Sequence, residues 1–292
     1  MGGYTTGIVT LLAINCIAAL GVSLFTGFTG IFTLGHAGYM AIGAYTTTIL
    51  TIQHSVHWLP AIVAGGLSAM VIAYLIGLPT LKLVGDYYTI ASLGLGEAIR
   101  LIIENWNSVT RGARGYPGID NFTTMPVALG FLVVMAIGMF FLVNSNYGRA
   151  FKACRDDYVA ASLLGFHTAR YRVQSLAISG FYCGVSGALL AGFMSFIQPV
   201  MFDMTKSTEL VSVVVFGGLG SMSGCLLGTT VLTLVTELFR GISQYRMLIY
   251  GLVLVLVMVL RPEGIMGTSE ITPSFVKGIF ARIAARRRIG GV

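Results

Sequence analysis

The sequence PVALGFLVVMAIGMFFLV, residues 126–143, decides the fold class of this chain of 292 amino acids. It contains no Asp, Glu, Lys or Arg, and a helix needs about 20 apolar residues to cross the hydrocarbon of a bilayer. Four more long apolar segments and three interrupted ones follow the same pattern. We therefore predict an all-α, polytopic helical membrane protein with about eight membrane segments, some of them glycine-interrupted or re-entrant. The other long segments are 5–26, 59–78, 173–196 and 245–260, and the interrupted ones are 28–50, 86–104 and 209–239.

The composition supports a membrane protein throughout. Only 10% of the residues are charged and 55% are hydrophobic, with a mean hydropathy of +0.85. A soluble domain of this size carries about a quarter charged residues. We expect one membrane domain, residues 1–267, followed by a basic tail, residues 268–292, and no second soluble domain.

A charged segment interrupts the apolar pattern at residues 149–172, RAFKACRDDYVAASLLGFHTARYR. A connection that only reverses the chain between two helices needs about two to eight residues. This longer segment is rich in Ala and Leu with Arg, Lys and Asp between them. The pattern predicts a short helix outside the membrane that meets a partner.

Two glycine-rich stretches lie in opposite halves of the chain, GFTGIFTLGHAGYMAIGAYTTTIL at 27–50 and FGGLGSMSGCLLGTT at 216–230. Paired glycine-interrupted segments at membrane depth point to a translocation site. Close helix packing is the alternative, because glycine also lets backbones approach, and it is our interpretation of the stripe Gly180, Gly184, Ala188 and Gly192. The candidate pathway residues are Thr33, Gly35, His36, Gly38, Tyr39, Gly217, Gly218, Gly220 and Ser221.

Two ionisable residues fall inside an interrupted segment, where charge is costly. Glu97 and Arg100 are three residues apart, so on a helix they can pair and neutralise each other. Asp86 follows Gly85 and is expected to cap a helix that begins at Tyr87. We interpret all three as structural.

Several function classes lack their motifs. No Gly-Lys dipeptide occurs, so there is no Walker A loop, and there is neither a His-Glu-x-x-His nor a Gly-x-Ser-x-Gly sequence. The four cysteines are scattered without a Cys-x-x-Cys pair, which indicates neither a disulfide framework nor a metal site. We expect no metal and no cofactor bound by this chain, and no intramembrane enzyme.

The net charge of +7 is explained by membrane topology rather than by nucleic-acid binding. If Lys82, residues 149–172 and everything after Leu260 share one side, that side holds twelve basic residues and the other side five. The positive-inside rule then makes the first side cytoplasmic. The loop at 105–125, which has the turn residues Gly112, Gly115, Pro117 and Gly118, is expected outside as a folded surface loop.

The core of the charged segment, VAASLLG at residues 159–165, matches the coupling motif of ABC importer permeases, Glu-Ala-Ala, three residues, Gly. Val159 stands where many such permeases have the glutamate. Further matches follow in chain order, and together they cover about residues 25–267. The chain resembles the LivM-type permease subunits of the branched-chain (hydrophobic) amino-acid ABC uptake family. The further matches are TLGHAGYMAIGAY at 33–45, GDYY at 85–88, GE at 96–97, YGRA at 147–150 and GGLGS at 217–221.

The resemblance implies a permease subunit in a bacterial inner membrane that translocates Leu, Ile or Val into the cytoplasm. It implies a heterodimer with a second, homologous permease, two cytoplasmic ABC ATPases that use the ATP, and an extracytoplasmic solute-binding protein. The segment 149–172 would couple this chain to the ATPases. The coupling residues implied by the resemblance are Arg149, Arg155, Val159, Ala160, Ala161 and Gly165.

Three other functions remain open from the residues. A permease for urea or short amides shares the architecture and similar signatures. An ion-coupled secondary transporter would need intramembrane carboxylates arranged for coupling, and only Glu97 is central. A membrane-embedded enzyme would need a catalytic group of residues that the motifs do not supply.

Overall fold

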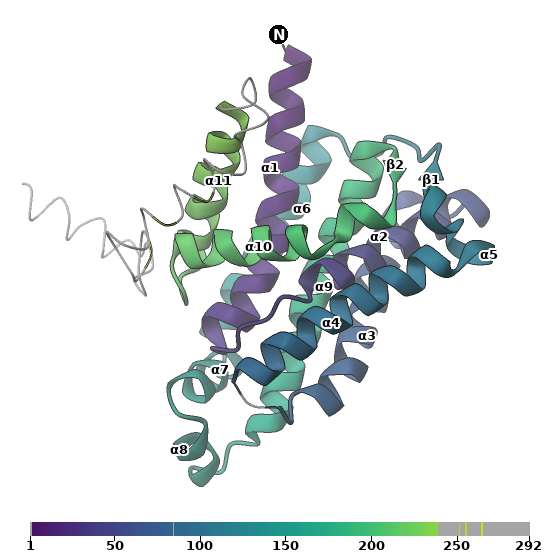
Figure 1. Ribbon diagram of the computed structural model, residues 1–292. Coiled ribbons are helices and arrows are strands. Elements are labelled where there is room, and N and C mark those ends of the chain that lie inside the picture. The colour runs from purple at the N-terminus through teal and green to yellow at the C-terminus, as the bar shows by residue number, and fades with distance from the viewer. Residues whose placement is uncertain (1, 84, 239–250, 252–254, 256–263, 265–292) are drawn as a thin grey trace, which may run out of the picture.

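The computed structural model describes residues 2–83 and 85–238, together with Gly251, Val255 and Gly264. The all-α prediction is confirmed, because helices make up almost all of this part, with one pair of two-residue strands, β1 (Tyr116–Pro117) and β2 (Phe196–Ile197) (Figure 1). The predicted segment 245–260 lies outside the described residues except at positions 251 and 255, and the tail 268–292 lies wholly outside them. The helices are α1 (Gly2–Val22), α2 (His36–Gln53), α3 (Trp58–Thr80), α4 (Asp86–Asn105), α5 (Asn107–Thr110), α6 (Met125–Asn144), α7 (Asn146–Asp156), α8 (Tyr158–Leu163), α9 (Thr168–Met194), α10 (Met204–Gly217) and α11 (Met222–Leu238).

Four helical stretches among the described residues are long and apolar enough to cross a membrane. They are Tyr4–Phe28, Trp58–Thr80, Met125–Asn144 and Thr168–Met194. The first combines α1 with the π-helix Ser23–Phe28 that continues it. The interrupted segments predicted from the glycines form helices that are shorter or more polar, namely α2, α4, α10 and α11. The number of full crossings beyond these four stays a prediction.

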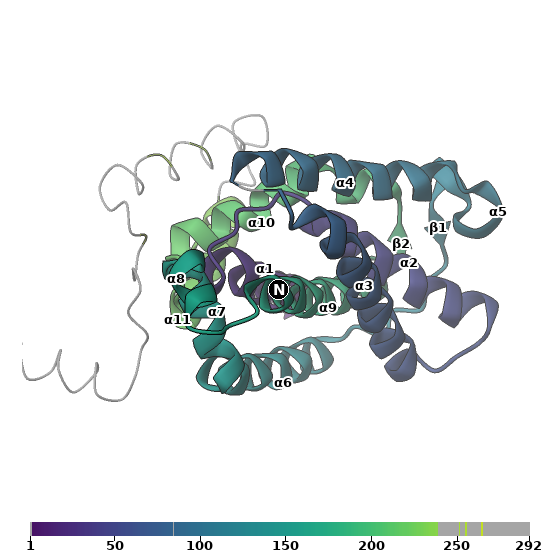
Figure 2. The ribbon, with the colours of Figure 1, turned by 90° about the horizontal axis from the view of Figure 1, so that it is seen from below.

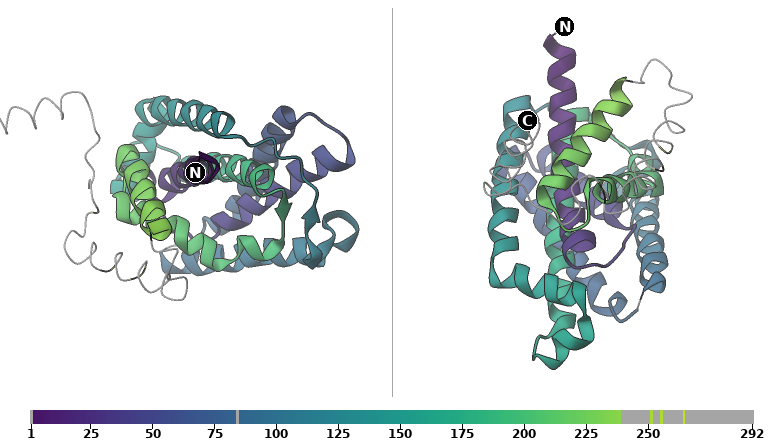
Figure 3. Two further views of the ribbon diagram at one scale, coloured as in Figure 1. Left: turned by 90° about the horizontal axis from the view of Figure 1, so that it is seen from above. Right: turned by 90° about the vertical axis from the view of Figure 1, so that its left-hand side faces the viewer.

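Helices α1 and α9 form the centre of the bundle. Seen along the vertical axis of Figure 1, both lie near the middle with the other helices around them (Figures 2 and 3). In their most apolar windows, 72% of α1 and 83% of α9 is buried, against 22% of α6 and 39% of α3. The outer faces of α3 and α6 are apolar and exposed, as is typical of helix surfaces that face lipid.

Small residues set the close crossings at this centre. A Cβ atom on Gly43 of α2 would overlap the backbone of Gly184 on α9, and one on Gly180 would come within 2.6 Å of the Ala73 side chain on α3. The packing interpretation is therefore confirmed for Gly180 and Gly184. Close approach of backbones supplies the dispersion contacts that hold membrane helices together.

The two ends of the bundle carry different extramembrane structures. Helices α7 and α8 lie at the end opposite the N-terminus of α1 (Figure 1). The loop at 105–125 is folded, as predicted, because β1 pairs antiparallel with β2, Tyr116 opposite Ile197, and the Tyr116 ring is buried. Tyr116 also donates a hydrogen bond to the Val109 carbonyl oxygen, 2.6 Å away.

One capping prediction is wrong. Helix α4 begins at Asp86 rather than at Tyr87, and its N-cap is Gly85, with φ of +61° and no side-chain capping bond. A residue in the first turn of a helix points away from the free N–H groups that an N-cap side chain reaches. Asp86 is instead an exposed acidic residue in the first turn of α4.

Candidate translocation site

The first glycine-rich break separates the π-helix Ser23–Phe28 from α2, which begins at His36. Residues 29–35 are not helical, and hydroxyl groups from other helices bind the backbone there. The Leu34 N–H donates to Ser92 Oγ of α4 at 3.1 Å, and the Ala37 N–H donates to Ser207 Oγ of α10 at 3.1 Å. Freed backbone groups at membrane depth need such partners, since no water is available.

His36 is fully buried at the start of α2. Its Nε2 atom lies 2.7 Å from Ser179 Oγ on α9, and its Nδ1 atom has no hydrogen-bond partner. The imidazole packs edge-on to the rings of Phe25 and Tyr39. His36 therefore ties the first break to the central helix α9.

The other candidate residues of the first break lie against α4. The Gly35 N–H donates to the Thr33 hydroxyl at 3.4 Å. A Cβ atom on Gly35 would come within 2.5 Å of the Ser92 carbonyl oxygen, and one on Gly38 within 3.1 Å of the Gly96 Cα. Both glycines are thus in close backbone contact with α4.

The second break lies between α10, which ends at Gly217, and α11. Gly218 and Gly220 have φ of +120° and +88°, a region that side-chain-bearing residues rarely adopt. The Ser221 hydroxyl accepts a hydrogen bond from the Gly224 N–H at 3.1 Å, which caps the start of α11. Gly217 packs against the backbone of Gly224, so the two helices fold closely on each other.

The two breaks meet. A Cβ atom on Gly27, in the π-helix, would come within 2.8 Å of the Gly220 backbone nitrogen. Residues almost 200 positions apart therefore place their backbones in contact at the two breaks. The contact is made by Gly27, the first residue of the predicted glycine-rich stretch, which was not among the candidate pathway residues.

Arg155 of α7 inserts at this meeting point. Its Nη1 atom donates to the Gly27 carbonyl oxygen at 3.4 Å and lies directly against Gly220. The Arg155 Cγ atom would lie 2.6 Å from a Cβ atom on Gly30. The same guanidinium forms an ion pair with Asp156 at 3.1 Å. Arg155 joins the charged segment to both glycine breaks, and only glycine leaves room for it.

The rest of the charged segment forms the end of α7, all of α8 and the first turn of α9. Arg149 and Val159 are exposed, as is Ala160, whereas Ala161 is buried. Gly165, with φ of +88°, reverses the chain after α8, and the Phe166 N–H bonds back to the Ala161 carbonyl oxygen at 3.1 Å. The predicted helix is confirmed, and Gly165 provides the turn that ends it.

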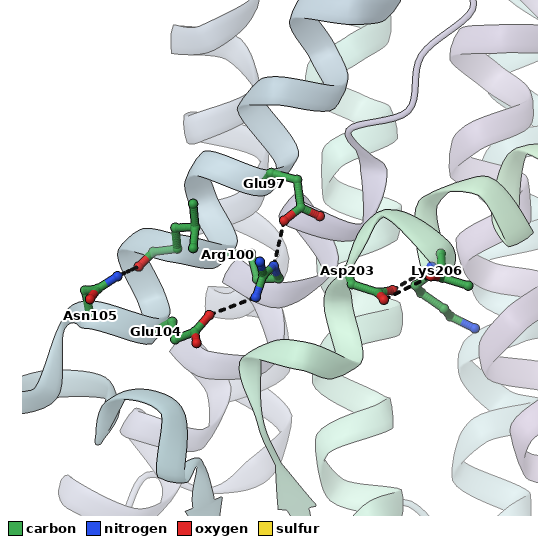
Figure 4. Close-up of polar contacts among 8 residues, drawn as sticks. Glu97, Arg100, Glu104, Asn105, Asp203 and Lys206 are labelled. Atoms are coloured by element: carbon green, nitrogen blue, oxygen red, sulfur yellow. Dashed lines mark hydrogen bonds and ion pairs between the residues drawn. The ribbon is translucent and has the colours of Figure 1, made fainter.

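A charged group on α4 faces the start of α10 (Figure 4). Arg100 pairs with Glu97 at 2.7 Å, as predicted, and also with Glu104 at 2.8 Å. Asp203, the N-cap of α10, adds a favourable charge interaction with Arg100. The spacing of Arg100 and Glu104, four residues on one helix, was the available signal for the second pair. All three carboxylates of this group interact with the one guanidinium, so the group keeps an excess of negative charge.

The described residues contain no group of three or more His, Cys, Asp or Glu that could hold a metal ion. The arrangement consists instead of helix ends, hydroxyls and a single inserted arginine. Two broken helices in contact with each other are typical of translocation sites in membrane transporters.

Sequence comparisons identify the family. The sequence model described as "Branched-chain amino acid transport system / permease component" matches residues 4–259, and the chain belongs to this family. It is 30% identical over 296 residues to the high-affinity branched-chain amino acid transport system permease protein LivM of Escherichia coli (strain K12), covering 90% of this chain and 70% of that protein.

Two further relatives carry names of the same transport system. The permease protein LivH of Salmonella typhimurium is 26% identical over 293 residues, covering 90% of this chain and 94% of the relative. The permease protein BraD of Pseudomonas aeruginosa is 28% identical over 143 residues, covering 48% and 46%. No solved structure matches the chain.

Proposed function

We propose that this chain is the transmembrane permease subunit of an ATP-binding-cassette importer that carries leucine, isoleucine and valine into the cytoplasm. Family membership supports the permease role, and the printed names of the relatives support the substrate class. Residues 1–267 would form the permease domain in a bacterial inner membrane, with the tail 268–292 in the cytoplasm.

The observation that carries the mechanism is the position of Arg155. An importer must convert the movement of its ATPases into opening and closing of a path through the membrane. In this chain α7 and α8 lie at one end of the bundle, and Arg155 extends from α7 to the Gly27–Gly220 contact. Movement of α7 would therefore pull on both breaks at once, because the guanidinium and the aliphatic stem touch different sides of the contact.

Helix α8 offers the surface for the ATPase. Leu163 and Leu164 are 83% and 78% exposed, and Val159 is half-exposed beside them. Apolar side chains at this density on an extramembrane helix fit a partner's groove. With Val159 in place of a glutamate, the docking would rest on apolar contact here rather than on a salt bridge.

The remaining components follow from the same proposal. ATP would be bound and hydrolysed by two partner ATPases, and this chain would hold no ATPase site and no cofactor. A homologous second permease would complete the path, and an extracytoplasmic binding protein would dock on the folded loop at 105–125. The pathway residues would be those of the two breaks, Thr33–Tyr39 and Gly217–Ser221.

Reconstitution tests the proposal. The chain is purified with its co-expressed partner subunits and binding protein, placed in proteoliposomes, and supplied with ATP on the ATPase side. We expect ATP-dependent uptake of radiolabelled leucine, isoleucine and valine, and no uptake when an ATPase variant that cannot hydrolyse ATP is used. Uptake of urea in preference to leucine would contradict the substrate, and uptake driven by an ion gradient without ATP would contradict the mechanism.

A further inference from the structure

A cavity lies beside the first break, at the end of the bundle where the charged segment emerges. Its volume is about 280 Å³, and it is bounded by the loop after the π-helix, by the connection from α3 to α4, and by the start of α9. Its apolar walls include Ile31, Phe32, Leu81 and Leu83. Two charged side chains, Asp86 and Arg172, also line the cavity, and the remaining lining residues are Gly30, Gly85, Tyr88 and Thr89.

Among the described residues, neither of these two charges forms a salt bridge with the other or with a third side chain. Within residues 2–83 and 85–238, the ion pairs involve Arg100, Arg155 and Lys206, and neither Asp86 nor Arg172 takes part. The Arg172 Nε atom is buried and has no hydrogen-bond partner. The Arg172 residue as a whole is partly exposed, and a single buried N–H without an acceptor costs about 1–3 kcal/mol. The cavity therefore offers a partly buried guanidinium and an exposed carboxylate to a ligand that carries both charges.

We propose that this cavity binds a free aliphatic α-amino acid from the side of the membrane on which α7 and α8 lie. Arg172 would bind the ligand's carboxylate, since a guanidinium presents parallel donors that match one. Asp86 would accept from its ammonium group, and the apolar walls would hold its side chain. The requirement for a zwitterion with an apolar part comes from the cavity alone; the choice of an aliphatic amino acid rests on the proposed function.

The location gives this site a consequence for transport. The Arg172 guanidinium lies over the Tyr158 ring of α8, 5.1 Å from its centroid, so one side chain borders both the cavity and the helix proposed to dock the ATPase. A carboxylate bound to Arg172 would compete with this cation–π contact. Amino acid delivered to this side would thus act on α8, and accumulated product would slow further uptake.

Equilibrium binding tests the site. The purified transporter, without its binding protein, is placed in phosphatidylcholine nanodiscs and titrated with radiolabelled L-leucine. We expect saturable binding that falls tenfold or more in affinity in Asp86→Asn and in Arg172→Gln. Lys82→Gln removes a charge from the same connection without touching this cavity, and it should bind leucine as the parent does. Thermal unfolding without ligand checks that each variant is folded.

Ligand analogues separate the two charges. L-leucinamide lacks the carboxylate and 4-methylpentanoate lacks the ammonium group, so each should displace leucine at least tenfold more weakly than leucine itself. Phosphatidylethanolamine, whose head group also pairs an ammonium with an anion, is added in a parallel set of nanodiscs. Equal leucine affinity in the parent, Asp86→Asn and Arg172→Gln would overturn the proposal. The proposal would also be overturned if leucine did not bind in phosphatidylcholine nanodiscs. It would be overturned as well if leucine binding depended on Asp86 and Arg172 only in nanodiscs that contain phosphatidylethanolamine.

The binding measurement separates this site from the proposed function. Leucine binding that depends on Asp86 and Arg172 can be observed even if the reconstituted transporter fails to take up leucine. If uptake is ATP-dependent but leucine trapped on the α7–α8 side does not slow it, the link to α8 fails while the importer assignment stands.

Discussion

At Arg155 the two parts of one side chain contact different elements. The aliphatic stem packs on Gly30 and the guanidinium reaches the Gly27 carbonyl oxygen and Gly220. The resemblance placed this residue among those that couple to the ATPase, and the structure directs it inward. It is the only side chain of the charged segment for which the described contacts reach both breaks. We therefore expect a substitution of Arg155 to impair transport more than a substitution of its exposed neighbours.

We predict that Arg155→Gln lowers ATP-driven uptake by about tenfold or more at an unchanged amount in the membrane. A hydrogen bond from a charged donor contributes about 1.5–3 kcal/mol, and each 1.4 kcal/mol is about a factor of ten. Arg149→Gln is the matched change on the same helix, where the exposed guanidinium reaches only Asn146 among the described contacts. Initial uptake rates in proteoliposomes provide the comparison, and an equal loss in both variants would remove the special role of Arg155.

A second residue-scale prediction concerns space at glycine. Gly35→Ala should destabilise the protein by about 1–3 kcal/mol, because its Cβ would come within 2.5 Å of a backbone oxygen of Ser92, which cannot move aside as a side chain can. Gly94→Ala, on α4, has open space around its Cβ and should be neutral or slightly stabilising. Thermal unfolding in detergent measures both. Similar melting temperatures for the two variants would show that the α2–α4 contact is loose.

Helix α8 carries the surface that we expect to bind the ATPase, and the burial of its residues decides which of them to substitute. Ala161 is buried, so a charge there would disturb the packing of α8 itself, whereas Leu163 and Leu164 are exposed and touch little of the chain. Leu163→Asp with Leu164→Asp should abolish co-purification of the ATPases and leave membrane insertion intact. Trp106→Asp, at an exposed apolar residue of the loop at 105–125, is the control and should leave the ATPases bound. Retention of the ATPases by the α8 double variant would exclude this surface.

The elements also show what the sequence could predict. Helix spans follow from local hydropathy, both glycine breaks appear where glycines collect, and the turn after α8 appears at the single glycine of the charged segment, because those properties depend on a residue and its near neighbours. The contact of Gly27 with Gly220 and the inward direction of Arg155 do not follow from any local pattern, since they depend on how distant helices pack. Asp86 is an example of this limit. The sequence predicted it as the N-cap of α4, but the helix begins one residue earlier, and Asp86 lines the cavity instead.

At the scale of the whole molecule, the two extramembrane structures should lie on opposite sides of the membrane. The folded loop with α5 and β1 and the α7–α8 pair are far apart in the bundle (Figures 1 and 2). From the bias of twelve basic residues against five in the sequence, we predict that α7 and α8 lie in the cytoplasm. Arg111 and Arg114 then lie outside, and Arg111 is held over the Tyr116 ring, 4.9 Å from its centroid, within the folded loop.

Cysteine labelling in intact cells measures this orientation. Ser108 in α5 and Ser162 in α8 are both exposed, so a cysteine at either position is accessible in the folded protein. The native Cys16, Cys154, Cys183 and Cys225 are buried, and burial raises the pKa of the Cys154 thiol, with Arg172 partly opposing the shift. A protonated thiol reacts slowly with thiol reagents, because the thiolate is the nucleophile.

With the native cysteines replaced, we expect an impermeant thiol reagent to label Ser108→Cys and to leave Ser162→Cys unlabelled. Both should be labelled after the membrane is permeabilised, which shows that protection reflects sidedness and not burial. The reverse pattern in intact cells would place α8 away from the cytoplasmic ATPases and would remove both the coupling role of Arg155 and the product-side location of the Asp86–Arg172 cavity.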